Sequence, residues 1–151
     1  MKKLLTGGIA AALAVAGIVA GAPASSAVAN VPAPYKLVGQ CPGSVVDTYT
    51  PANTLGDTQG SLKLYYSSAN GGTNCVMLFD NAPGKHSMTV TLRRNDLDYQ
   101  GSDSGVFETY AGGVLVPSTN GRCVFVSGVL WMGTHSVDRF SVSKGPVHCG
   151  S

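Results

Sequence analysis

Residues 61–80, SLKLYYSSANGGTNCVMLFD, contain the strongest fold signal in this 151-residue chain. In the first half, apolar residues alternate with polar ones, which is the period of a half-buried β-strand. The second half, NCVMLFD, is another short apolar run. Between them lies Asn70-Gly71, a dipeptide that adopts left-handed conformations and turns the chain without splaying the strands. We therefore predict a β-hairpin formed by residues 61–68 and 74–80.

Short β-branched and aromatic segments continue on both sides of this hairpin, separated by turn residues. They are residues 44–50, 87–94, 106–110, 114–117, 122–130 and 137–143. No segment shows a sustained helical period. The spacing predicts an all-β fold, a single small antiparallel β-sandwich or barrel stapled by two disulfides, and we prefer the sandwich.

Several glycine-containing segments indicate where the chain turns. Residues 118–121, STNG, predict a second hairpin between the segments on either side of them. We interpret Asp103-Ser104-Gly105 and Gly112-Gly113 as turns as well. Gly128 lies inside an apolar run, where it indicates a bulge or a close backbone approach.

The N-terminal residues 1–29 are typical of a signal peptide. Lys2 and Lys3 precede a short apolar run, and Ala27-Val28-Ala29 supplies the small residues that signal peptidase accepts, so we expect cleavage before Asn30. A cut after Ala24 is the alternative. The expected organisation is a Pro-containing arm over residues 30–40 and an all-β domain over 41–151, in a secreted, extracellular protein.

The charge of the mature chain argues against two classes of partner. All eight acidic residues lie after residue 30, as do eight of the ten basic residues, since Lys2 and Lys3 belong to the signal peptide. The mature chain is therefore neutral, with its charges dispersed. We expect no nucleic-acid partner, and no membrane association after the signal peptide is removed.

The four cysteines predict two disulfides in an exported protein. Their spacing does not fit a zinc site, because no two lie two to four residues apart. Four cysteines allow three pairings, and sequence alone does not choose among them. Our preferred pairing is Cys41 with Cys149 and Cys75 with Cys123, which would tie the first strand region to the last.

The polar residues form no recognisable catalytic motif. Ser104 lacks the flanking glycines of a nucleophile elbow, and the three histidines have no neighbouring carboxylate motif, so we expect no catalytic residues, no cofactor and no enzymatic activity. A loop calcium site is one interpretation of the acidic residues, and a solvated acidic loop is the other, because the EF-hand pattern is not met. The calcium candidates are Asp96, Asp98, Asp103 and Glu108.

Aromatic residues are the remaining candidates for ligand binding. If they point outward, they could form a platform on which sugar rings stack, and if inward, they are ordinary core packing. The candidates are Tyr65, Tyr99, Tyr110 and Trp131.

Three segments together resemble one known family. GSLKLYYSSANGGTNCV at 60–76, DSGVFETYAGGVLV at 103–116 and GRCVFVSGVL at 121–130, with a terminal Cys149-Gly150, resemble the spore-associated protein A family of actinobacteria. The resemblance implies an exported, cell- or spore-surface-associated protein with four cysteines. It supplies no biochemical activity and no catalytic residues.

The expected function is therefore that of a secreted, non-catalytic surface protein. Its partner would be a cell-wall or spore-surface component or a glycan, bound by a binding module. Two alternatives stay open: a secreted protease inhibitor, acting through an exposed loop such as residues 51–60, and a hydrolase of unrecognised type. For the hydrolase, Ser104, Asp103 and His135 are the candidate residues.

Overall fold

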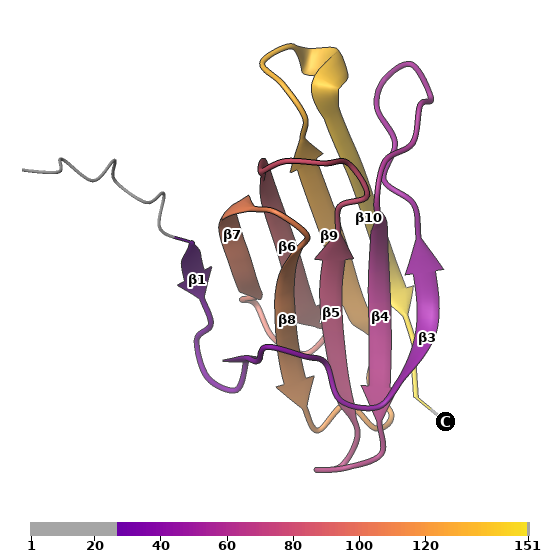
Figure 1. The fold of residues 1–151 in the computed structure, drawn as a ribbon. Helices are drawn as coiled ribbons and strands as arrows, with labels where there is room; N and C mark the ends of the chain where they lie inside the picture. Colours follow the sequence, from indigo (N-terminus) through magenta and orange to yellow (C-terminus); the bar gives the residue numbers. More distant parts are fainter. Residues whose placement is uncertain (1–26, 151) are drawn as a thin grey trace, which may run out of the picture.

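The computed structural model describes residues 27–150, which form two five-stranded antiparallel sheets packed face to face (Figure 1). One sheet has the order β1-β7-β6-β9-β10 and the other the order β2-β8-β5-β4-β3. The predicted all-β sandwich is confirmed. Most of the predicted signal peptide lies outside these residues, and within them no helix is long and apolar enough to cross a membrane.

The elements follow one another at short intervals along the chain. Their bounds are β1 (Val28–Asn30), β2 (Lys36–Leu37), β3 (Ser44–Tyr49), β4 (Ser61–Ser67), β5 (Thr73–Phe79), β6 (His86–Arg94), β7 (Gly101–Phe107), β8 (Tyr110–Pro117), β9 (Val124–Trp131), a short 3-10 helix (Ser136–Asp138) and β10 (Arg139–Val147).

The predicted hairpin at residues 61–80 is confirmed. β4 and β5 pair in antiparallel register from Ser61 opposite Phe79 to Ser67 opposite Thr73. At the turn, Asn70 and Gly71 have φ angles of 57° and 71°, which is the left-handed conformation that these two residue types tolerate best.

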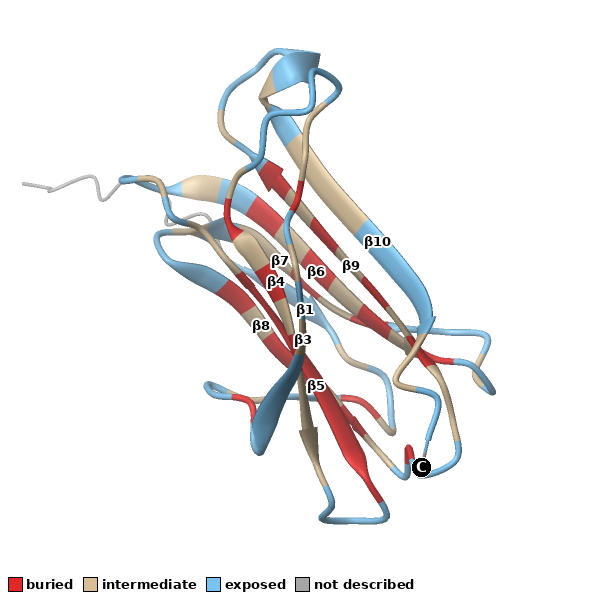
Figure 2. Ribbon diagram, turned by 90° about the vertical axis from the view of Figure 1, so that its right-hand side faces the viewer, coloured by how far each residue is buried: buried red, intermediate tan, exposed pale blue. Residues whose placement is uncertain are grey.

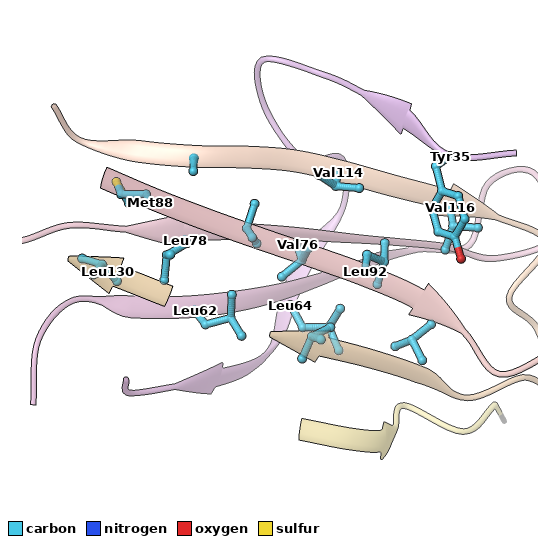
Figure 3. Packing of buried hydrophobic residues seen from close by; sticks show 14 residues of the cluster. Tyr35, Leu62, Leu64, Val76, Leu78, Met88, Leu92, Val114, Val116 and Leu130 are labelled. Carbon is cyan, nitrogen blue, oxygen red and sulfur yellow. The ribbon is translucent and has the colours of Figure 1, made fainter. Parts of the chain in front are cut away.

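The core lies between the two sheets. It is built from the residues of each strand that point inward, which are every second residue along the strand. Along β6 and β9 every second residue is buried, so that buried and partly exposed positions alternate along each strand (Figure 2). Figure 3 shows how leucine and valine side chains from both sheets interdigitate. Burying each such side chain stabilises the fold by about 1.5–3 kcal/mol, so this layer supplies most of the driving force. The fully buried members include Leu62, Leu64, Val76, Leu78, Val90, Leu92, Val126 and Leu130.

The second predicted hairpin, at residues 118–121, is wrong. β8 and β9 belong to different sheets, so the chain crosses the sandwich there. The backbone groups of this segment bond to the first hairpin turn: Ser118 N donates to Asn70 O, Thr119 N to Gly72 O and Asn120 N to Gly71 O. These bonds satisfy the polar groups that a hairpin would otherwise pair locally.

The interpretation of two glycine segments as turns is wrong, because both lie within strands. Asp103-Ser104-Gly105 lies within β7, and Gly112-Gly113 lies within β8, where the register with β5 shifts between Val76 and Met77. The glycines permit close approach. A Cβ atom on Gly105 would lie 2.7 Å from Ala27 Cα, and one on Gly113 would lie 2.8 Å from Val38 Cγ2.

Two disulfides are present, but the preferred pairing is wrong. The bonds join Cys41 to Cys75 and Cys123 to Cys149. Cys75 lies on β5 between inward-pointing neighbours, so its side chain points out of the sandwich, away from the other sheet, whose strand β9 begins directly after Cys123. The partner of Cys123 instead follows β10, the strand that pairs with β9.

The Pro-containing arm is part of the sandwich. β1 pairs with β7, and β2 pairs with β8, so residues before Cys41 complete one edge of each sheet. The expected cleavage before Asn30 falls inside β1, whereas the alternative cut after Ala24 leaves this strand whole.

Peptide mapping without reduction tests the disulfide arrangement. We expect one linked peptide pair containing Cys41 and Cys75 and another containing Cys123 and Cys149. Because the bonds close segments with sequence separations of 34 and 26 residues, replacing either pair by serine should lower the free energy of unfolding by about 3–4 kcal/mol in the loop-entropy account. A Cys41–Cys149 linked peptide would contradict the structure.

Gly128 tests the packing between the sheets. Its neighbours are side chains of the other sheet and not the close backbone predicted from its position: a Cβ atom there would lie 2.9 Å from Leu78 Cδ1 and 3.1 Å from Leu62 Cδ1, both in fully buried side chains. We expect Gly128→Ala to lower the free energy of unfolding by about 1–3 kcal/mol, measured by urea denaturation. Gly39→Ala is the matched control, since no atom lies within 4 Å of the added carbon. Equal stability of the two variants would refute this packing.

Candidate binding groove on an outer sheet face

The outer face of the β2-β8-β5-β4-β3 sheet carries an apolar cluster separate from the core. Strand alternation on β5 places Val76 and Leu78 inside the sandwich and Cys75, Met77 and Phe79 on the outer face. The buried members of this cluster are Cys41, Cys75 and Met77, and the partly buried members are Val38, Tyr65, Phe79 and Leu115.

The N-terminal arm covers one side of this cluster. Val38 N donates to Gly113 O at 2.9 Å, and the Cys41–Cys75 disulfide fixes the following residues over β5. Gly113 has no side chain to obstruct the arm, whose Val38 side chain occupies that space. The arm therefore forms a fixed rim along the sheet.

A shallow cavity of about 310 Å³ lies beside this rim, and below we call it the aromatic groove. Its lining consists of Gly39, Gln40, Tyr65, Met77, Phe79 and Tyr110. The rings of Phe79 and Tyr110 are 6.0 Å apart at 45°, and the Tyr110 hydroxyl donates to Gly39 O at 3.3 Å. Lys63 Nζ lies 5.0 Å from the centre of the Phe79 ring. The groove thus combines aromatic surface with one amide and one nearby cation.

Two of the four predicted aromatic candidates come together here. Tyr65 and Tyr110 line the groove, and Tyr110 is 38% exposed. Tyr99 instead holds the arm, because its hydroxyl donates to Ala33 O and its ring lies edge-on to Tyr35. Trp131 lies on the other sheet.

Sequence reasoning missed Phe79 and Gln40. Phe79 had a signal, because it shares the alternation of Cys75 and Met77 and therefore their face. Gln40 had none, since its place depends on the path of the arm and on the pairing of Cys41.

The four calcium candidates are not brought together. Asp103 is buried and accepts a hydrogen bond from Gly112 N at 2.9 Å, whereas Asp96, Asp98 and Glu108 are exposed. Over residues 27–150, no group of three or more His, Cys, Asp or Glu side chains is arranged to hold a metal ion.

The Asp96 carboxylate forms ion pairs with two arginines. Arg94 Nε donates to Asp96 at 2.6 Å, and Arg122 Nη1 lies 3.0 Å from its other oxygen. Desolvation tends to raise the pKa of Asp96, but the hydrogen bond from Arg94 and the charges of both arginines outweigh it, so this pKa lies below its usual value.

The hydrolase candidates do not assemble either. Ser104 and Asp103 are neighbours on β7 and point to opposite faces of the sheet, and His135 lies beside the short 3-10 helix, where its backbone N donates to Asp138. A different pair, His86 with Asp80, is in contact at 2.5 Å. Asp80 also accepts from Gln59 Nε2 and Ala82 N, so this pair fixes the loop between β5 and β6.

The loop proposed for protease inhibition is a compact turn. Asn53 Oδ1 accepts from the backbone N atoms of Leu55 and Asp57, and Asn53 Nδ2 donates to Val137 O. Leu55 is 71% exposed at its tip. The loop is folded on itself, which does not favour the extended docking to a protease active site that an inhibitor needs.

No protein-family model, curated protein or solved structure matches this chain. The resemblance to the spore-associated protein A family therefore remains a prediction. A larger cavity of about 360 Å³ has no aromatic ring in its lining, which includes Lys36, Asn70 and Leu115. The aromatic groove differs from it in the convergence of three aromatic side chains.

Proposed function

We propose that this protein is an exported, non-catalytic binding module of the cell or spore surface, and that its aromatic groove binds a glycan. The observation that carries the proposal is the convergence of Tyr65, Phe79 and Tyr110 around one open cavity beside the Gln40 segment. The three rings come from the adjacent strands β4, β5 and β8, and the Gln40 segment belongs to the arm that the Cys41–Cys75 disulfide holds.

The chemistry of the groove suits a sugar. Sugar rings have apolar C–H faces and hydroxyl edges, so they pack on aromatic rings while bonding to polar groups at the side. Tyr65, Phe79 and Tyr110 supply aromatic surface, and the Tyr65 hydroxyl and the Gln40 amide supply donors and acceptors. The Tyr110 hydroxyl donates to Gly39 O and is not needed for the sugar. An open groove with this mixture fits part of a surface polymer better than a small enclosed substrate.

The lining also supports binding without catalysis. Glycoside hydrolysis generally needs two carboxyl groups flanking the scissile bond, and the residues that line the aromatic groove include no Asp or Glu. Rigid support from the disulfide and from strands β4, β5 and β8 lowers the entropy lost on binding.

The covalent framework supports location outside the reducing cytosol. Two disulfides indicate an oxidising environment. Export is proposed from the predicted signal peptide. Surface attachment is proposed from the resemblance to the spore-associated protein A family.

Co-sedimentation with insoluble glycans tests this function. Purified protein would be mixed with peptidoglycan, chitin, cellulose and isolated cell walls. We expect retention by at least one of these, and about a tenfold loss of affinity for Tyr65→Ala or Tyr110→Ala, since each ring buries apolar surface against the sugar.

Tyr110→Phe is the matched control. It keeps the ring and removes only the hydrogen bond to Gly39, so it should bind within about twofold of the parent, a difference well below the 1.4 kcal/mol of a tenfold change. Circular dichroism confirms that each variant is folded. Absence of retention on every glycan, or retention unaffected by both alanine variants, would overturn the proposal.

A further inference from the structure

The opposite outer face of the sandwich, on strands β7, β6, β9 and β10, presents ordered rows of hydroxyl groups. The strand register places Ser102, Thr91, Ser127 and Ser143 in one row across the four strands. The next row contains Ser104, Thr89, Val129 and Ser141. The hydroxyls of Thr91 and Ser127 are hydrogen-bonded to each other at 2.5 Å, which orients them side by side. We call this surface the hydroxyl face.

An arginine stacked on an aromatic ring stands at each end of the hydroxyl face. Arg93 Cζ lies 4.1 Å from the centre of the Phe125 ring, and Arg139 Cζ lies 5.8 Å from that of Trp131. Phe125 and Trp131 are six residues apart on β9, a separation of about 20 Å along an extended strand. Stacking restricts each guanidinium group, and Arg139 Nη1 also donates to Ser141 Oγ at 3.2 Å. Because a guanidinium group has five N–H donors, Arg139 keeps donors beyond the one that bonds Ser141.

A polar cavity of about 200 Å³ lies at the Arg93 end. Thr91, Ser127 and Ser143 line it together with Arg93, Gln100 and Phe125. It is therefore a recess with hydroxyl, amide and guanidinium donors over an aromatic ring.

The charged side chains on the hydroxyl face are all positive. The inward positions of β7 carry Asp103, but the outward positions of the four strands contain arginine and no carboxylate. A ligand that complements this surface carries negative charges at separated points and polar groups between them.

We propose that the hydroxyl face binds an extended acidic polysaccharide, with one uronate-type carboxylate paired to Arg93, a second paired to Arg139, and the intervening sugars lying over the rows of serine and threonine. Each guanidinium fork matches a carboxylate, and the aromatic ring beneath it offers a stacking surface for the adjoining sugar. Simultaneous use of both ends raises the affinity for a polymer far above that for a single sugar.

The arrangement favours a polysaccharide over a nucleic acid. Nucleic-acid binding rests on neutralising several successive phosphates, whereas this face offers one stacked arginine at each end with uncharged hydroxyls between them. The inference does not depend on the aromatic groove, because the two surfaces lie on opposite sheets and share no residue.

Isothermal titration calorimetry tests the proposal with polygalacturonate as the probe. We expect binding that weakens when NaCl is raised from about 0.05 M to about 0.5 M, because salt screens the arginine–carboxylate pairs. Arg93→Gln and Arg139→Gln should each lower the affinity about fivefold, as expected for loss of one solvent-exposed charge pair. Monomeric galacturonate should bind at least about a hundredfold more weakly, since it reaches only one arginine.

Two control variants distinguish binding at the hydroxyl face from a general effect of charge and from binding at the aromatic groove. Lys36→Gln removes an equal charge from β2 in the other sheet and should leave polygalacturonate binding unchanged. Tyr110→Ala, which removes a ring from the aromatic groove, should also leave it unchanged, so failure of one proposal is distinguishable from failure of the other. Equal loss in the Lys36→Gln variant, equal affinity for the monomer, or tighter binding of dextran sulfate or a single-stranded oligonucleotide would overturn the inference.

Discussion

Burial of strand β5 on both faces is the constraint on which the rest of the structure depends. Its inward residues Val76 and Leu78 complete the core between the sheets, while Cys75 and Met77 are buried from the other side. A strand with two apolar faces needs cover on each. The second sheet covers one face, and the disulfide-bonded N-terminal arm covers part of the other.

The incomplete cover over β5 produces the groove. Between Val38 and Cys41 the arm is fixed by a backbone hydrogen bond and by a disulfide, and farther along β5 the outer face stays open. Apolar surface left open beside a rigid rim is a common basis of binding sites, since little order has to be gained on binding. The same covalent bond therefore serves both stability and the shape of the site.

The two outer sheet faces have opposite character, which follows from their strands. β5 places sulfur and aromatic side chains outward, whereas β6 places Ser87, Thr89 and Thr91 outward and β9 alternates aromatic or apolar residues with Ser127. Arg93 on β6 and Arg139 on β10 lie at the two ends of this face. Both faces nonetheless combine aromatic rings with polar donors, the combination that sugars select. The two proposals accordingly assign a different polymer to each side of the sandwich.

Local signals in the sequence predicted the class of fold and the central hairpin, but not how strands distant in the sequence pair. Asn70-Gly71 acts on its immediate neighbours, so its effect could be predicted. The roles of Gly105 and Gly113 could not be predicted, because each glycine makes room for a residue that is distant in the sequence. The predicted disulfide pairing was wrong for the same reason. The direction of the Cys75 side chain excludes Cys123 as a partner only once β5 and β9 are known to lie in different sheets. Tyr65 and Tyr110 were named as candidates from residue type alone, and their convergence required the β5–β8 register.

The most direct test of this account is a two-dimensional NMR titration of the isotopically labelled protein with a soluble oligosaccharide from a glycan that retains it. The account predicts chemical-shift changes concentrated at Gln40, Tyr65, Phe79 and Tyr110, the residues that surround the aromatic groove. Changes confined to other surfaces, with these four residues unaffected at saturation, would contradict it.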